Sequence, residues 1–131
     1  RETSDVLSIQ NEDVIKFTVY HPNECEELCT PEFIPYWKKH AQVAAAGKEW
    51  VDCNALGVSK WTAISYLMEH FGIAADEVCV FGDNLNDIEM LTNAGTSYAV
   101  SNARPEVIQA AKYTCAPYWE SGVLQILKTF L

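Results

Sequence analysis

Short stretches with a two-residue apolar period dominate the first 55 residues. In these stretches β-branched and aromatic residues alternate with polar ones, which predicts strands over residues 13–20, 43–46 and 49–54. Residues 24–28 and 31–39 predict two helices, because the prolines in this region break or begin a helix. Together they predict a small β-α-β unit with too little apolar surface for a complete domain. Residues 1–13 show no clear period and predict a loop or the tail of a missing element.

From Ser59 onward the apolar period changes to three or four residues, and helices alternate with strands. Ser59 is a good N-cap for a helix over residues 61–71, and Gly72 is the expected stop. The later elements are a strand at 78–81, a helix from 88, a strand at 96–100, a helix from Pro105, a strand at 113–116 and a helix at 122–130. This alternation predicts an α/β fold, with a parallel sheet between helices in a three-layer α/β/α, Rossmann-like arrangement.

The composition limits the classes of binding partner and the cellular compartment that can be expected for the chain. The 131 residues carry a formal net charge of −9, which argues against nucleic acid and anionic membranes as main partners. No apolar run reaches the ~18 residues that a membrane span requires. The five cysteines are odd in number and none has C-x-x-C spacing, which predicts free thiols in a reducing compartment, the cytoplasm.

The turn after the predicted strand at 78–81 is unusually rich in short acids and amides. Gly82 permits a tight turn, and the side chains that follow include Asp83, Asn84, Asn86 and Asp87. Asn84 or Asn86 can simply cap the next helix. Capping needs only one such side chain, however, and two nearby carboxylates repel each other unless a cation is close. Ligands of open α/β sheets bind just past the carboxyl ends of strands, so the turn is a candidate site.

Lys60 is the expected cationic partner of this turn. It lies in the first turn of the helix that begins after Ser59, and the next strand starts 18 residues later. A right-handed crossover brings the beginning of such a helix near the carboxyl end of that strand, so Lys60 and Asp83 can converge. A lysine at a helix N-terminus can hold a phosphate. The alternative is an ordinary solvated lysine.

These motifs resemble those of a known family, the haloacid dehalogenase (HAD) superfamily. The third and fourth motifs of HAD phosphatases, in particular of the Cof-type subgroup with a type IIB cap, are similar to residues 57–60, 81–91 and 94–95, and the likeness continues at 98–103, 110–111 and 122–123. The resemblance covers the chain well from Leu56 to its C-terminus and loosely over residues 14–54. It implies that residues 1–55 are the C-terminal part of an α/β cap domain. Residues 56–131 would be the C-terminal part of a HAD-like core domain.

The resemblance also implies a chemistry. Asp83 would be a ligand of Mg²⁺, and Lys60 would bind the transferring phosphoryl group and hold it against the nucleophile. Asn86 would hydrogen-bond the same phosphate or the substrate, and Asp87 would orient Lys60 or the metal shell. The expected activity is Mg²⁺-dependent hydrolysis of small phosphorylated metabolites through an aspartyl-phosphate.

Two departures from the family pattern qualify this expectation. Trp61 follows the lysine where the family usually has glycine, so its ring either reshapes substrate access or packs on a neighbouring helix. The family's nucleophile lies in an Asp-x-Asp motif, and this sequence contains none. The chain is therefore expected to be the C-terminal half of a longer enzyme and to be inactive alone.

Two other functions remain as hypotheses. The chain would be a non-catalytic half-domain if it self-associates through an exposed sheet edge, or pairs with another chain there. The turn also resembles that of the phosphorylation domain of P-type ATPases, but the absence of membrane spans argues against this assignment.

Overall fold

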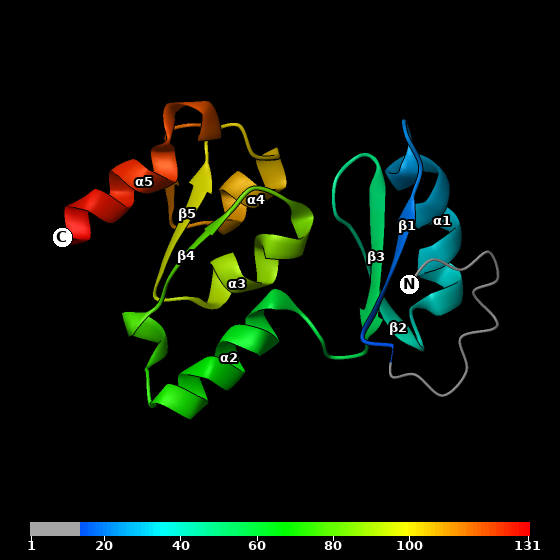
Figure 1. Ribbon diagram of the computed structural model, residues 1–131, viewed down its shortest axis with the longest axis horizontal. Coiled ribbons are helices and arrows are strands. Elements are labelled where there is room, and N and C mark those ends of the chain that lie inside the picture. Colours follow the sequence, from blue (N-terminus) through cyan, green and yellow to red (C-terminus); the bar gives the residue numbers. More distant parts are fainter. Residues whose placement is uncertain (1–13) are drawn as a thin grey trace.

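Two separate three-stranded sheets organise the protein. The computed structural model describes residues 14–131, so the loop expected over residues 1–13 lies outside the described residues. One sheet has the order β1-β3-β2 and the other the order β4-β5-β6. We call the part of the chain from β1 to β3 the N-terminal unit, and the part from α2 onward the C-terminal unit; the two lie side by side (Figure 1).

The N-terminal unit is an antiparallel sheet with one apolar and one polar face. Its strands are β1 (Lys16–Tyr20), β2 (Ala41–Ala45) and β3 (Trp50–Ala55). The strand register places one set of residues toward the helix α1, namely Phe17, Val19, Ala41, Val43, Ala45, Val51, Cys53 and Ala55. The opposite face carries Lys16, Thr18, Tyr20, Gln42, Ala44, Trp50, Asp52 and Asn54, and it faces the C-terminal unit (Figure 1). Alternation at period two thus sorts the residues of the sheet between a small core and a polar surface.

A single helix, α1 (Cys25–Trp37), replaces the two helices that the prolines predict. Pro31 and Pro35 both lie inside it. Each proline removes one backbone donor, which weakens a helix but does not have to end it. The helix continues because it packs along the apolar face of the sheet, where Cys25 and Val51 are fully buried. Tertiary contact therefore overrides the local signal.

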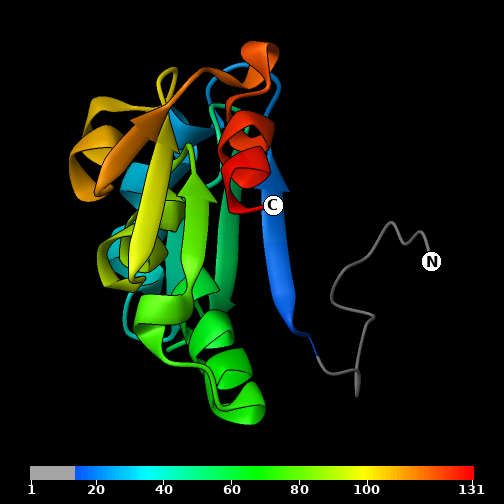
Figure 2. The same cartoon turned by 90° about the vertical axis from the view of Figure 1, so that its left-hand side faces the viewer.

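The C-terminal unit has the predicted alternation of helices and parallel strands. Its elements are α2 (Lys60–Phe71), β4 (Cys79–Gly82), α3 (Ile88–Asn93), β5 (Thr96–Val100), α4 (Pro105–Ala110), β6 (Tyr113–Cys115) and α5 (Gly122–Leu127), with 3₁₀ turns η2 (Ala75–Glu77), η3 (Leu85–Asp87), η4 (Tyr118–Glu120) and η5 (Lys128–Phe130). The strands β4, β5 and β6 pair in parallel, and Figure 2 shows their arrows pointing the same way. The prediction of an α/β fold with a parallel sheet is confirmed.

The core of this unit lies on one face of the parallel sheet. Leu91, Ala94 and Val107 come from α3, its end and α4, and they pack with Val80 and Ala99 of the sheet. The opposite face carries a stack of aromatic rings from Phe81, Tyr98 and Tyr113, with centroid separations of 5.4 and 5.3 Å. Phe81 is only half-buried, so the apolar run of β4 is not covered equally on its two faces.

All five cysteines are free. Burial raises the pKa of the Cys25, Cys53, Cys79 and Cys115 thiols, which disfavours their thiolate forms. In residues 14–131 no helix has the length and apolar character needed to cross a membrane.

Candidate functional site

The carboxylate of Asp87 organises the turn after β4. Its side chain is almost fully buried, and Oδ2 accepts hydrogen bonds from the backbone N–H groups of Asp83 and Asn84, at 2.9 and 3.1 Å. Its other oxygen, Oδ1, accepts from Lys60 Nζ. Gly82 is required beside it, because a Cβ at that position would lie 2.6 Å from the Cβ of Asp87. A buried anion thus holds both the turn and the lysine.

Lys60 reaches Asp87 from the first turn of α2, whereas the crossover argument pairs it with Asp83. Ser59 caps this helix: its Oγ accepts from Thr62 N at 3.1 Å, and Thr62 Oγ1 accepts from Ser59 N at 2.8 Å. The Lys60 side chain is 50% exposed while that of Asp87 is 2% exposed. An ammonium group has three donors, so Lys60 can bind Asp87 with one and still present the others to a ligand.

Of the remaining polar side chains of the turn, one has a structural role and two can still bind a ligand. Asn84 caps η3, with Oδ1 accepting from Leu85 N at 2.8 Å, so the capping explanation holds for this residue. The Asp83 side chain is exposed and has no ion-pair partner among residues 14–131. Asn86 Oδ1 is buried without a hydrogen-bond partner in the described structure. Asp83 and Asn86 therefore keep unused capacity for a ligand.

Of the two roles expected for Trp61, access to the substrate and packing on a helix, the structure supports packing. Its ring is partly buried and packs against the core cluster that contains Leu91 and Val107. The ring therefore takes part in fixing α2 on the C-terminal unit, and it does not line the cavity described below.

The turn offers part of a metal site. Within the described range, no three His, Cys, Asp or Glu side chains gather in a way that could hold a metal ion. Asp83 alone presents a free carboxylate, because Asp87 is engaged by Lys60 and two backbone amides. Mg²⁺ commonly uses one or two carboxylates together with water and substrate phosphate. The residues present thus fit one protein ligand of such an ion.

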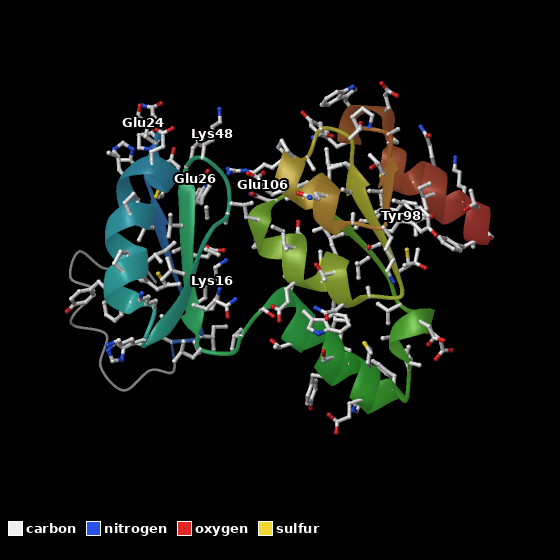
Figure 3. All side chains as sticks on the ribbon, turned by 180° about the vertical axis from the view of Figure 1, so that it is seen from behind. Lys16, Glu24, Glu26, Lys48, Tyr98 and Glu106 are labelled. Atoms are coloured by element: carbon white, nitrogen blue, oxygen red, sulfur yellow. The ribbon has the colours of Figure 1, made fainter. Side chains whose placement is uncertain are left out.

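A cavity of about 360 Å³ opens between the two units beside this turn. Its lining on the C-terminal unit includes Lys60 and Asn86. The polar face of the N-terminal unit forms the opposite wall, with Lys16, Gln42, Asp52 and Asn54. In Figure 3, Lys16 lies on the side of β1 that faces the C-terminal unit. The volume falls at the lower end of the range of about 300–1,000 Å³ that is usual for small-molecule sites.

A second, larger cavity of about 960 Å³ lies between α1 and the start of α4. Four glutamates line it, Glu24, Glu26, Glu27 and Glu106, together with Lys48 and Arg104 (Figure 3 labels four of these six). The guanidinium of Arg104 is already bound to both carboxylate oxygens of Glu26. This acidic lining is unsuited to a phosphate, and the smaller cavity beside Lys60 is the better candidate site.

Sequence reasoning brings together Lys60, Asp83, Asn86 and Asp87 but misses the opposite wall. Lys16, Asp52 and Asn54 lie in predicted strands, and no local motif indicates a role for them. The signal that could have found them is the alternation itself, which puts all three on the polar face of a sheet. No local sequence pattern predicts the Arg104–Glu26 ion pair, because its partners are 78 positions apart in the chain.

Known proteins with related sequences include two phosphatases. A 5-amino-6-(5-phospho-D-ribitylamino)uracil phosphatase of Escherichia coli is 41% identical over 85 residues, which cover 65% of this chain and 31% of that protein. A protein of Bacillus subtilis with the same activity in its name is 31% identical over 90 residues, covering 69% of this chain and 36% of its own.

Solved structures extend the similarity to the whole described fold. A crystal structure from Eubacterium rectale is 71% identical with a TM-score of 0.79, and the match covers 100% of this chain and 49% of that one. The HAD subclass IIB sugar phosphatase BT4131 is 31% identical with a TM-score of 0.77, covering 92% of this chain and 44% of its own. The chain spans about a third to a half of the length of these relatives.

The family assignment follows from the sequence over nearly its full length. Residues 1–127 match the description haloacid dehalogenase-like hydrolase. The resemblance drawn from the lysine motif and the acidic turn is thereby confirmed, and the protein belongs to the haloacid dehalogenase-like hydrolase family.

Proposed function

We propose that this chain forms the phosphate-holding part of a phosphatase that acts on small phosphorylated metabolites. One observation carries the proposal: the buried Asp87 holds the Lys60 ammonium beside the turn that presents Asp83, at the edge of a cavity of about 360 Å³. The names of the E. coli and B. subtilis relatives, both phosphatases, support it. The free thiols fit a cytoplasmic setting.

The proposed roles follow from the geometry of each group. Lys60 binds a phosphoryl oxygen with the donors that Asp87 leaves free, and the N-terminus of α2 adds its positive end. Asp87 keeps the ammonium from swinging into solvent, and its other oxygen accepts hydrogen bonds from two backbone N–H groups. Asn86 offers its amide to the phosphate or the substrate. Mg²⁺, when bound through Asp83, supplies charge neutralisation at the phosphoryl oxygens.

The proposed reaction also requires a nucleophile, which we assign to a segment outside this sequence. No Asp-x-Asp motif occurs in the sequence, so the aspartate that takes the phosphoryl group must be supplied by another segment. Within residues 14–131, β4 pairs only with β5, which leaves its other edge open beside Gly82 and Asp83. A further parallel strand on that edge would bring its carboxyl end to Asp83. Residues 1–55 would then act as part of the cap and 56–131 as part of the core.

The same open edge favours one alternative. A second copy of the chain could pair along β4 and form a non-catalytic dimer, since an unpaired edge strand is a template for association. Light scattering of the isolated chain distinguishes the two cases. A defined dimer without phosphatase activity in any context supports the alternative.

The function is tested by completing the enzyme. The E. rectale protein is 71% identical over the whole of this chain, so the chain can replace the matched half of that protein in a chimera. We expect the chimera to hydrolyse p-nitrophenyl phosphate in the presence of Mg²⁺, while the isolated chain does not. Asp83→Ala and Lys60→Met should each lower kcat/KM by about 10²–10³-fold, the usual loss for a group that stabilises transition-state charge.

The matched control is Glu120→Gln, which removes an exposed carboxylate outside the site and should leave the rate unchanged. Mg²⁺-dependent hydrolysis that survives Asp83→Ala would overturn the proposed role of the turn.

A further inference from the structure

The cavity beside Lys60 contains a second lysine whose charge is neutralised within the protein. Lys16 Nζ lies 2.6 Å from Asp52 Oδ2, and the other oxygen of Asp52 accepts from Thr18 Oγ1 at 2.9 Å. The Asp52 side chain is 12% exposed and that of Lys16 is 48% exposed. Asp52 thus sits fixed in the central strand of its sheet, while the lysine that it holds reaches toward the open space.

The wall across from Lys60 is otherwise rich in neutral hydrogen-bonding groups. Gln42 and Asn54 line the cavity next to the Lys16–Asp52 pair. Two amides and a carboxylate with unused lone pairs can both donate to and accept from hydroxyl groups. Among the described residues, Ala44 is the one aliphatic residue that the N-terminal unit contributes to the lining, while Val58, Ala63 and Leu85 of the opposite wall supply apolar surface.

Charge around the cavity favours one anionic group and opposes a second. A phosphoryl group at Lys60 would have the cation and the N-terminus of α2 beside it. An additional phosphate or carboxylate on the far side would meet the Lys16–Asp52 ion pair, which is carried by strands β1 and β3 and not by a helix N-terminus. Coulomb interactions over a few ångströms remain substantial in a partly enclosed cavity. Among residues 14–131, the far wall therefore offers a lysine that is paired with a carboxylate, as Lys60 is, but that lacks the helix N-terminus that adds positive charge beside Lys60.

We infer that Asp52 determines specificity by neutralising Lys16. The cavity thereby takes monophosphates whose leaving group is neutral and rich in hydroxyls, and it rejects substrates that carry a second anionic group. This inference rests on the proposed phosphatase function, because it assigns the reacting phosphate to Lys60.

A purely structural role for the ion pair makes a different prediction. Thr18 and Asp52 are directly paired across β1 and β3, so the network also stabilises the pairing of the two strands. A structural role changes stability and lowers the rates for all substrates alike. A role in specificity changes the ratio of the rates for two substrates, which is the quantity to measure.

The test compares two esters of one sugar in the chimera with the E. rectale protein. For fructose 1-phosphate and fructose 1,6-bisphosphate, kcat/KM is obtained from the initial rate of phosphate release. Asp52→Asn keeps the shape of the side chain but frees the charge of Lys16, and should raise the bisphosphate-to-monophosphate ratio about tenfold. Lys16→Gln leaves Asp52 as an unpaired anion, and should lower the ratio. The double variant carries neither charge and should return the ratio to near the wild-type value.

Each outcome decides one of the two ideas. Hydrolysis of the monophosphate with the same ratio, within twofold, in wild type, Asp52→Asn and Lys16→Gln would overturn the inference and leave the phosphatase function standing. A folded wild-type chimera that cleaves neither ester nor p-nitrophenyl phosphate would overturn the proposed function and the inference with it. If Asp52→Asn does not fold, Lys16→Gln decides alone, because its half-exposed side chain can be replaced with little structural cost.

Discussion

Replacing Asp87 by asparagine tests the claim that one buried carboxylate holds both the turn and Lys60. Asparagine has nearly the same volume, so it leaves no cavity. Its single amide oxygen can still accept from the backbone N–H groups of Asp83 and Asn84. Its NH₂ group would then face the ammonium of Lys60, donor against donor. The variant therefore removes charge while it preserves packing.

The magnitude follows from the hydrogen bonds that are lost or weakened. A hydrogen bond to a charged group contributes about 1.5–3 kcal/mol, and the bond to Lys60 is lost outright. The lower part of that range applies, because the Lys60 side chain is 50% exposed and water can replace part of the interaction. The two backbone bonds become neutral and lose roughly half their strength. We expect the free energy of unfolding to fall by about 2–3 kcal/mol in total.

Urea denaturation of the chain, followed by circular dichroism, measures this change. With an m-value of about 2 kcal/mol/M, the midpoint should fall by roughly 1–1.5 M urea and m should stay constant. Asp83→Asn is the matched control, since it alters an exposed carboxylate of the same turn and should change stability by less than about 0.5 kcal/mol. An Asp87→Asn midpoint equal to that of wild type would show that the carboxylate does not hold the turn.

Two further predictions concern the contact between the units and the packing under β5. The hydrogen bond from Arg104 lowers the pKa of Glu26 below its ordinary value of 4.5. The ion pair therefore stabilises the folded protein fully above pH 4.5. This contribution is lost as the pH falls through the lowered pKa. Glu26→Gln should therefore lower the free energy of unfolding by up to about 1 kcal/mol at pH 7 and leave it unchanged at strongly acidic pH. Free energies of unfolding that vary with pH in parallel for wild type and Glu26→Gln would contradict this. Gly95→Ala would place a Cβ 2.3 Å from Asp76 Cα. This clash should lower the free energy of unfolding by about 3 kcal/mol and the Tm measured by calorimetry by roughly 10 °C. An unchanged Tm would show that the backbone can shift there.

Part of the candidate site could be predicted because its signals are local. The acidic turn, the N-cap at Ser59 and the position of Lys60 in the first turn of a helix all depend on residues within a few positions of one another. A helix that runs antiparallel to the strand after it then brings Lys60 near the turn, although β3 and β4 belong to different sheets and α2 is no β-α-β crossover between them. The crossover argument pairs Lys60 with Asp83, whereas in the structure Lys60 binds Asp87, the residue that the family resemblance assigns to orienting it, and Asp83 stays exposed.

The sequence by itself determined the periods, the helix caps, the order of the elements and the family, since each of these depends on neighbouring residues or on short motifs. Only the tertiary structure decided that α1 continues through Pro31, that Arg104 binds Glu26 and that Asp52 faces the cavity of Lys60. These features join segments far apart in the chain. Their free energy comes from burial and charge pairing, which exist only after the two sheets have formed and packed.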